Sequence, residues 1–224
     1  AQNEQNRTIA FSDKDENMML HFASIAAVAL ERAQMTRAIL LRMIRMAEMR
    51  DPKETGAHVN RVGGYAVEIY EKWANKRDFS QREIDKNRDI LRMAAMLHDV
   101  GIFETNTPEL GCSGKHPYVC HGYLGKKILE KKGLSQHALV CERHVGTGIT
   151  AEEIKLNKLP LPQRDMVPIS IEEQIICFAD KFFSKNGEMD NCERSVEDIL
   201  NTLRRYGPEK VNRFQKWMHL FGHH

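Results

Sequence analysis

Helical spacing of apolar residues runs through almost the whole of this 224-residue chain. Three sequences, at 80–83, 150–153 and 170–173, place Ser or Thr three residues before Glu. Each predicts the start of a helix, because such a pair can cap the first helical turn reciprocally. No stretch alternates between apolar and polar residues for long enough to predict a strand. These patterns predict an all-α fold.

A long helix is predicted at the start of the chain, because residues 1–50 contain neither glycine nor proline. Apolar residues recur there at three- and four-residue spacing from Met18 to Arg50, and Asp13 or Asp15 can cap the helix. We therefore divide the chain into this helix and a compact helical body at 51–224. Two interpretations of the apolar stripe stay open. The helix pairs with that of a second copy in a homodimer, or it folds back on its own body.

The bulk composition excludes several classes of protein. Hydrophobic residues make up 42% of the chain, charged residues make up 29%, and the formal net charge is +2. Such a balanced charge predicts neither a nucleic acid polymer nor an anionic membrane as a partner. No apolar run approaches the roughly 18 residues that span a bilayer, and no signal peptide is recognised. The five cysteines are odd in number and form no CxxC, which predicts a reduced, cytoplasmic setting.

The candidate functional residues are histidines and aspartates, each on or beside an apolar helical face. An apolar run leads to His98-Asp99 and ends at Gly101, and imidazole and carboxylate can together bind a divalent metal. A single histidine on such a face is usually an ordinary core residue. Burying several without a metal or a dense hydrogen-bond network costs several kcal/mol for each unpaired charge. The set comprises His58, His98, Asp99, His121, His144 and Asp180.

The order His … His-Asp … His … His … Asp resembles the HD superfamily of metal-dependent phosphohydrolases, and so does the context Ala179-Asp180-Lys181. The likeness extends over roughly residues 50–185. It implies an HD-domain helical bundle, preceded here by the long N-terminal helix, with two divalent metal ions. Carried over, the first ion would be held by His58, His98, Asp99 and Asp180. The second would be held by Asp99, His121 and His144.

The resemblance also implies roles for neighbouring residues. Asp99 would bridge the two ions and orient the attacking water. Positive side chains would offset the charge of a phosphate, and the nearest by sequence are Arg61, Arg143 and Lys181. Histidine-rich sites bridged by aspartate favour Fe or Mn, followed by Mg, Ni or Zn.

Different parts of the chain resemble different branches of the superfamily. Residues 11–13 and the alanine-rich helix after them look like the end of a GAF sensor domain and its linker. Residues 50–58 are similar to the entry of HD-GYP cyclic-dinucleotide phosphodiesterases, in which a Glu one turn before the first His can add a ligand. Glu54 occupies that place before His58. From His98 onward, residues 101–122 and 142–148 look like those of small stand-alone bacterial HD hydrolases. After His144, the second His, the Glu, the Asp and the Tyr-Pro of the HD-GYP motif are absent.

We therefore expect a metal-dependent phosphohydrolase that cleaves a phosphate ester or anhydride of a small molecule, with a nucleotide as the expected substrate class. Two alternatives stay open. One is a signalling domain related to cyclic-di-GMP phosphodiesterases, degenerate or binding a nucleotide without turnover. The other is an HD-fold di-iron oxygenase, because the same ligand set resembles that of those enzymes.

Overall fold

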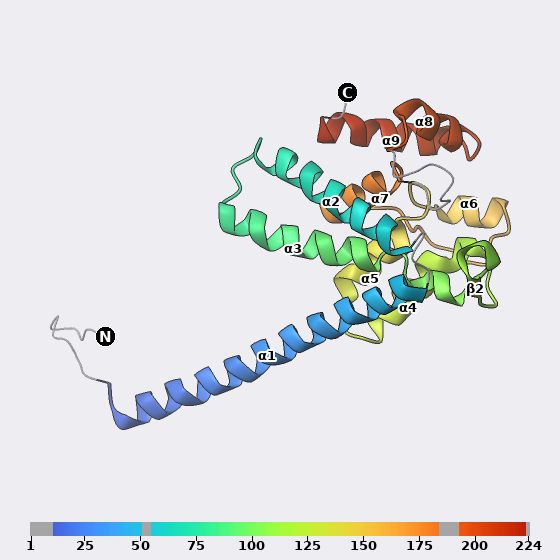
Figure 1. Ribbon diagram of the computed structural model, residues 1–224. Coiled ribbons are helices and arrows are strands. Elements are labelled where there is room, and N and C mark those ends of the chain that lie inside the picture. Colours follow the sequence, from blue (N-terminus) through green and yellow to red (C-terminus); the bar gives the residue numbers. More distant parts are fainter. Residues whose placement is uncertain (1–10, 51–54, 184–192, 223–224) are drawn as a thin grey trace. The chain divides into compact units, whose positions relative to one another are not determined.

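The computed structural model describes residues 11–50, 55–183 and 193–222 (Figure 1). It divides into two compact units, Ala1–Met46 and Ala47–His224. Helix α1 (Asp13–Arg50) makes up nearly all of the described part of the first unit and ends four residues beyond it. Its cap is Ser12, whose hydroxyl accepts a hydrogen bond from Asp15 N at 3.3 Å, while Asp15 Oδ2 accepts one from Ser12 N at 3.0 Å. The prediction of an aspartate cap was wrong, because the serine before the helix completes this reciprocal pair.

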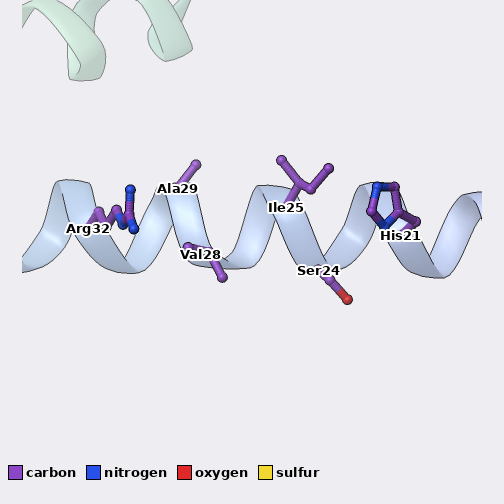
Figure 2. Close-up of a pocket in the computed structure, with 6 residues that line it drawn as sticks. All are labelled: His21, Ser24, Ile25, Val28, Ala29 and Arg32. Carbon is purple, nitrogen blue, oxygen red and sulfur yellow. The ribbon is translucent and has the colours of Figure 1, made fainter.

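Helix α1 exposes large apolar side chains on several sides. Those at least half exposed in its described part are Met18, Met19, Leu20, Phe22, Ile25, Val28, Leu30 and Met35. Figure 2 shows one shallow strip of this surface, lined by His21, Ser24, Ile25, Val28, Ala29 and Arg32. Residues at this spacing share one side of a helix. The predicted homodimer through this helix stays a prediction.

The second unit is helical, which confirms the all-α prediction. Its helices are α2 (Thr55–Ala74), α3 (Gln81–Leu97), α4 (His121–Glu130), α5 (Ser135–Arg143), α6 (Ala151–Leu156), α7 (Ile171–Asp180), α8 (Val196–Arg204) and α9 (Pro208–Phe221). The three predicted capping boxes are all present, at the starts of α3, α6 and α7. Among the described residues, no helix is both long and apolar enough to cross a bilayer.

Residues 100–120 differ from the prediction. They contain three short 3-10 helices, η1 (Val100–Glu104), η2 (Pro108–Leu110) and η3 (Tyr118–Cys120). They also contain a two-stranded antiparallel sheet, β1 (Asn106–Thr107) and β2 (Cys112–Ser113). Strands of two residues are too short to give an alternating pattern. Pro117 keeps an extended backbone, with ψ at 149°, and α4 begins at His121, directly after η3.

Helix α7 lies at the centre of the core. Its residues from Ile175 to Ala179 are fully buried, and it packs against α2, α3, α5 and α9. The Phe178 ring lies 4.9 Å from that of Phe214 in α9 and 5.1 Å from that of Phe182. Rings at this spacing fix the positions of their helices. Asp180, the last residue of α7, is therefore held at a defined place by the most deeply buried helix of the unit.

Candidate metal centre

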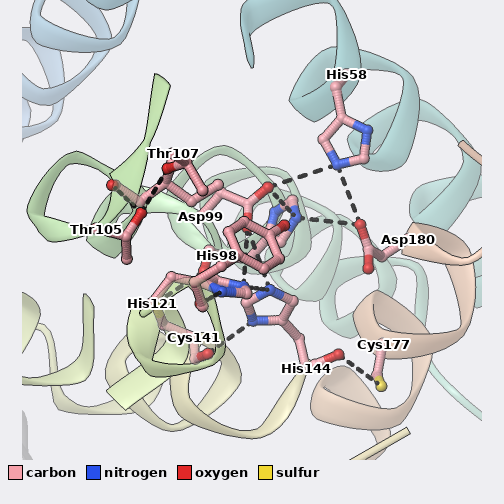
Figure 3. A network of polar contacts seen from close by, with 12 residues as sticks. His58, His98, Asp99, Thr105, Thr107, His121, Cys141, His144, Cys177 and Asp180 are labelled. Atoms are coloured by element: carbon pink, nitrogen blue, oxygen red, sulfur yellow. Dashed lines mark hydrogen bonds and ion pairs between the residues drawn. The ribbon is translucent and has the colours of Figure 1, made fainter. Parts of the chain in front are cut away.

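The six histidines and aspartates singled out in the sequence lie together in the second unit (Figure 3). They lie in or directly beside five helices: α2 carries His58, His98 and Asp99 follow the last residue of α3, α4 begins with His121, α5 ends before His144, and α7 ends with Asp180. All six are buried, and the most exposed retains 8% of its accessible surface. Helices far apart in sequence thus deliver their polar residues to one point inside the protein.

Asp99 is the centre of this cluster. Its Oδ2 atom lies 3.2 Å from His98 Nε2 and 3.6 Å from His58 Nε2. Its Oδ1 atom lies 3.2 Å from His144 Nε2 and 3.5 Å from His121 Nε2. Each oxygen of one carboxylate therefore faces a different pair of histidines.

Asp180 completes the first of these two groups. Its Oδ1 atom lies 3.1 Å from His58 Nε2 and 3.4 Å from His98 Nε2. Its other oxygen, Oδ2, lies 2.6 Å from Lys181 Nζ. Two sets of three residues within the described chain, His58–His98–Asp180 and His98–Asp99–His144, bring their ligand atoms within 4.8 Å of one another. Both sets are compact enough to hold an ion.

Backbone hydrogen bonds aim three of the histidine rings inward. The Nδ1 atoms of His98, His121 and His144 lie 2.6, 2.6 and 2.7 Å from the carbonyl oxygens of the residues three positions earlier. A carbonyl oxygen only accepts, so each Nδ1–H must be the donor. In the neutral ring the Nε2 lone pair is then left to face the centre of the cluster. Metal-binding histidines are held in this way.

The convergence of these nitrogen and oxygen atoms would be stabilised by a cation. His121 Nε2 and His144 Nε2 lie 3.0 Å apart and both face Asp99 Oδ1, so two lone pairs and a carboxylate oxygen meet. The Nε2 atoms of His58 and His98 are buried without a hydrogen bond of good geometry to any described residue. Acceptors that converge in a buried site repel one another unless a proton or a metal ion lies between them. The donor set fits divalent metals that take imidazole and carboxylate ligands.

The pKa shifts indicate a site of negative charge. Burial lowers the pKa of His98, but the carboxylates of Asp99 and Asp180 outweigh burial and raise this pKa to about 9. Burial is the main cause that lowers the pKa of His58 and that of His144, which keeps both rings neutral. The two carboxylates thus favour positive charge at this place, and a divalent metal ion would supply it.

Glycines allow the ligand-bearing segments to approach closely. A Cβ atom on Gly101 would lie 2.0 Å from the carbonyl oxygen of His121, and one on Gly122 would lie 2.7 Å from that of Cys141. The segments η1, α4 and α5 therefore meet backbone to backbone, which any side chain at these positions would prevent. This contact is what brings Asp99 within 3.5 Å of two histidines on different helices.

The three positive side chains predicted near the site contact different groups. Lys181 pairs with Asp180, at the edge of the cluster. Arg143 donates from Nη1 to both oxygens of Glu173, at 2.8 and 2.9 Å, and so connects α5 to the start of α7. The Arg61 guanidinium lies 5.9 Å from the centre of the Phe183 ring. Glu54 lies outside the described residues.

Sequence reasoning missed several residues that support the cluster. The Cys141 thiol donates to the carbonyl oxygen of His98 at 2.8 Å, and the Cys177 thiol donates to that of His144 at 3.3 Å. The Glu142 carboxylate is fully buried and pairs with the Arg164 guanidinium. Glu142 lies four residues after Ala138, on the buried side of α5, and this spacing could have indicated a buried carboxylate. Its partner 22 residues later could not be inferred from the sequence.

A model of the HD domain matches residues 55–184, which is more than half of the chain. An uncharacterized protein of Methanocaldococcus jannaschii is 34% identical over 146 residues, which cover 64% of this chain and 75% of that protein. The chain therefore belongs to the HD-domain family. The resemblance expected from the ordered motifs is confirmed at this level, and divalent metal binding is a general property of the family.

Two tRNA (cytidine(56)-2'-O)-methyltransferases are also similar to this chain. The protein of Picrophilus torridus is 37% identical over 99 residues, which cover 44% of this chain and 25% of the enzyme. The protein of Thermoplasma volcanium is 29% identical over 122 residues, which cover 54% of this chain and 31% of the enzyme. The chain thus spans only a quarter to a third of these methyltransferases.

Proposed function

We propose that the second unit is a metal-dependent phosphohydrolase with a two-metal site, which cleaves a phosphate ester or anhydride of a nucleotide. The ligands of the first position are His58, His98, Asp99 and Asp180, and those of the second are Asp99, His121 and His144. Glu54 remains a proposed additional ligand of the first position. Fe or Mn is the proposed metal, ahead of Mg, Ni and Zn. A cytoplasmic location stays a prediction.

The observation that carries this proposal is that the two oxygens of the Asp99 carboxylate face different pairs of histidines. One oxygen faces His58 and His98, and the other faces His121 and His144. A carboxylate with ligand groups on both sides could be shared by two metal ions. Two ions held by these residues would supply a hydroxide at neutral pH and would neutralise the charge of a phosphate.

The protein's own groups prepare the site for this chemistry. The three Nδ1–H donors fix the ring orientations of His98, His121 and His144, so little reorganisation is needed when ligands bind. The Lys181 ammonium holds one oxygen of Asp180 and leaves the other toward the histidines. We propose that Lys181, Arg61 and Arg143 also offset phosphate charge, with Arg143 in addition holding α7 through Glu173.

The relatives support a nucleotide as the substrate class. Two of them bear the name of an enzyme that modifies cytidine in tRNA, and this chain matches part of each. A match to part of an enzyme that acts on a nucleotide of tRNA favours a nucleotide phosphate over other phosphate esters as the ligand. The proposed ligand is a small nucleotide and not a nucleic acid polymer.

The test is hydrolysis of a panel of nucleoside mono-, di- and triphosphates, cyclic dinucleotides and a chromogenic phosphodiester, with added Mn²⁺ or Fe²⁺. We expect turnover of at least one nucleotide by the wild type and none above background by Asp99→Ala. Equal rates for the two proteins would contradict the proposal.

The same panel separates the alternatives. Hydrolysis restricted to cyclic-di-GMP would favour the HD-GYP-related signalling domain, and nucleotide binding without turnover would favour its degenerate form. Oxygen consumption that requires iron would favour a di-iron oxygenase. Full activity with a redox-inactive metal would exclude that oxygenase.

A further inference from the structure

The loop that follows His144 is fastened to the rest of the unit by side chains of α7 and α9. Its backbone carbonyls accept a series of hydrogen bonds. The Cys177 thiol of α7 donates to the carbonyl oxygens of His144 and Gly146, at 3.3 and 3.4 Å. Arg213 of α9 donates from Nη1 to the carbonyl oxygen of Thr147 at 2.6 Å.

Lys210 of α9 makes the most deeply buried of these contacts. Its ammonium donates to the carbonyl oxygen of Gly148 and lies 2.6 Å from Glu153 Oε1. Lys210 retains only 5% of its accessible surface, although lysine is seldom buried unless it is paired. In return, the Thr147 hydroxyl donates to the carbonyl oxygen of Lys210 at 3.5 Å. The loop and the first turn of α9 are therefore bonded in both directions.

Glu153 extends this connection to the other end of the loop. Its carboxylate accepts a hydrogen bond from Thr150 N at 2.8 Å and completes the capping box of α6. Lys210 thus contacts both Gly148 in the loop and Glu153 in α6, the helix that follows the loop. The burial of the Glu153 carboxyl opposes ionisation, but the bonds from Lys210 and Thr150 outweigh burial and lower its pKa. Burial in turn lowers the pKa of Lys210, and the Glu153 carboxylate opposes that shift.

His144 is the C-cap residue of α5, where its Nδ1 atom donates to the carbonyl oxygen of Cys141, and the loop begins directly after it. On its C-terminal side, the chain turns at once through Gly146 and Gly148, both with positive φ. A glycine-rich turn is conformationally free unless other groups hold it. The carbonyl contacts from α7 and α9 supply that restraint, at the ligand itself and two to four residues after it.

We infer that Lys210 is a positioning residue, which holds His144 at the second metal position through the loop at 145–150. The inference rests on the proposed two-metal site. Lys210 and Arg213 both lie beyond residues 55–184, which match the HD domain. Helix α9 would thus be a part of the metal centre contributed from outside the matched region.

The test is a calorimetric titration of the chelator-treated full chain with Mn²⁺, comparing the wild type with Lys210→Met. Methionine keeps the apolar length of the side chain and removes its donors. The matched control is Lys216→Met, on the exposed side of the same helix. Changes to residues that support metal ligands typically cost 10- to 100-fold in affinity. We expect one Mn²⁺ to bind Lys210→Met as it binds the wild type, and the second to bind about 10- to 100-fold more weakly.

A purely structural role would give a different result. Lys210→Met would then lower the melting temperature in chelator while both Mn²⁺ affinities stay at the wild-type values, and this outcome would overturn the inference. Should Lys210→Met fail to fold, Arg213→Met is titrated in its place, with the same expected loss of the second affinity. If the wild type itself binds no Mn²⁺, the proposed two-metal function fails. If both affinities are unchanged in the variants, only the role of α9 fails.

Discussion

Replacement of Gly101 by alanine tests how the ligand-bearing segments are brought together. The added Cβ atom would lie 2.0 Å from the carbonyl oxygen of His121 and 2.4 Å from Gly125 N, whereas ordinary contact begins at 3.4 Å. Both neighbours are backbone atoms of α4, so no side chain can rotate to relieve the clash. Helix α4 must therefore move away from η1 by more than an ångström, and His121 moves with it, away from Asp99.

We expect Gly101→Ala to lower the free energy of unfolding by about 3 kcal/mol, the upper part of the range for overpacked cores. The second metal affinity should fall with it. Gly64→Ala is the matched control, because Gly64 is exposed in the middle of α2 and a Cβ atom there meets nothing within 4 Å. That control should gain about 0.5 to 1 kcal/mol. Urea unfolding measures both. A Gly101→Ala protein as stable as the wild type would refute the backbone-contact explanation.

Three further predictions follow from the same geometry. In chelator, the urea midpoint should be highest near pH 6.5. The raised pKa of His98 means that the folded protein binds its proton more tightly than the unfolded chain does, and the stability that this gives is lost as pH rises toward 9. The lowered pKa values of His58 and His144 mean that the unfolded chain binds protons more tightly at these two residues, so stability also falls below pH 6.5. Arg164→Met should lower the free energy of unfolding in urea by about 2 kcal/mol, because the buried Glu142 carboxylate loses its guanidinium partner and keeps Lys126 at 3.6 Å. The control Arg204→Met breaks an exposed ion pair and should lower it by less than about 1 kcal/mol. Removal of residues 1–50 should convert a dimer into a monomer in light scattering, and an unchanged mass would remove the proposed role of α1.

The all-α fold and the helix starts could be predicted because their signals are local. A capping box is complete within four residues, so the sequences at Ser80, Thr150 and Ser170 were sufficient. The cap of α1 was mistaken because Ser12 and Asp15 form a fourth reciprocal pair that has Asp where Glu is the usual partner. The short sheet near Gly111 escaped notice because two-residue strands leave no periodic signal.

The members of the candidate site could be named from the sequence, but their arrangement could not. The order of the histidines and aspartates indicated a set of ligands. The sequence carried no information on which Asp99 oxygen faces which pair of histidines, because that depends on the packing of η1, α4 and α5 through Gly101 and Gly122. The contact between Lys210 and Gly148 joins a helix and a loop that lie 62 positions apart and share no motif.

Elemental analysis of protein purified without chelator tests the central claim most directly. A bridging Asp99 predicts about two equivalents of transition metal per chain, and about one or fewer in Asp99→Asn, which keeps the shape of the side chain and removes its charge. Fewer than one equivalent in the wild type, even after incubation with Mn²⁺ or Fe²⁺, would contradict the account.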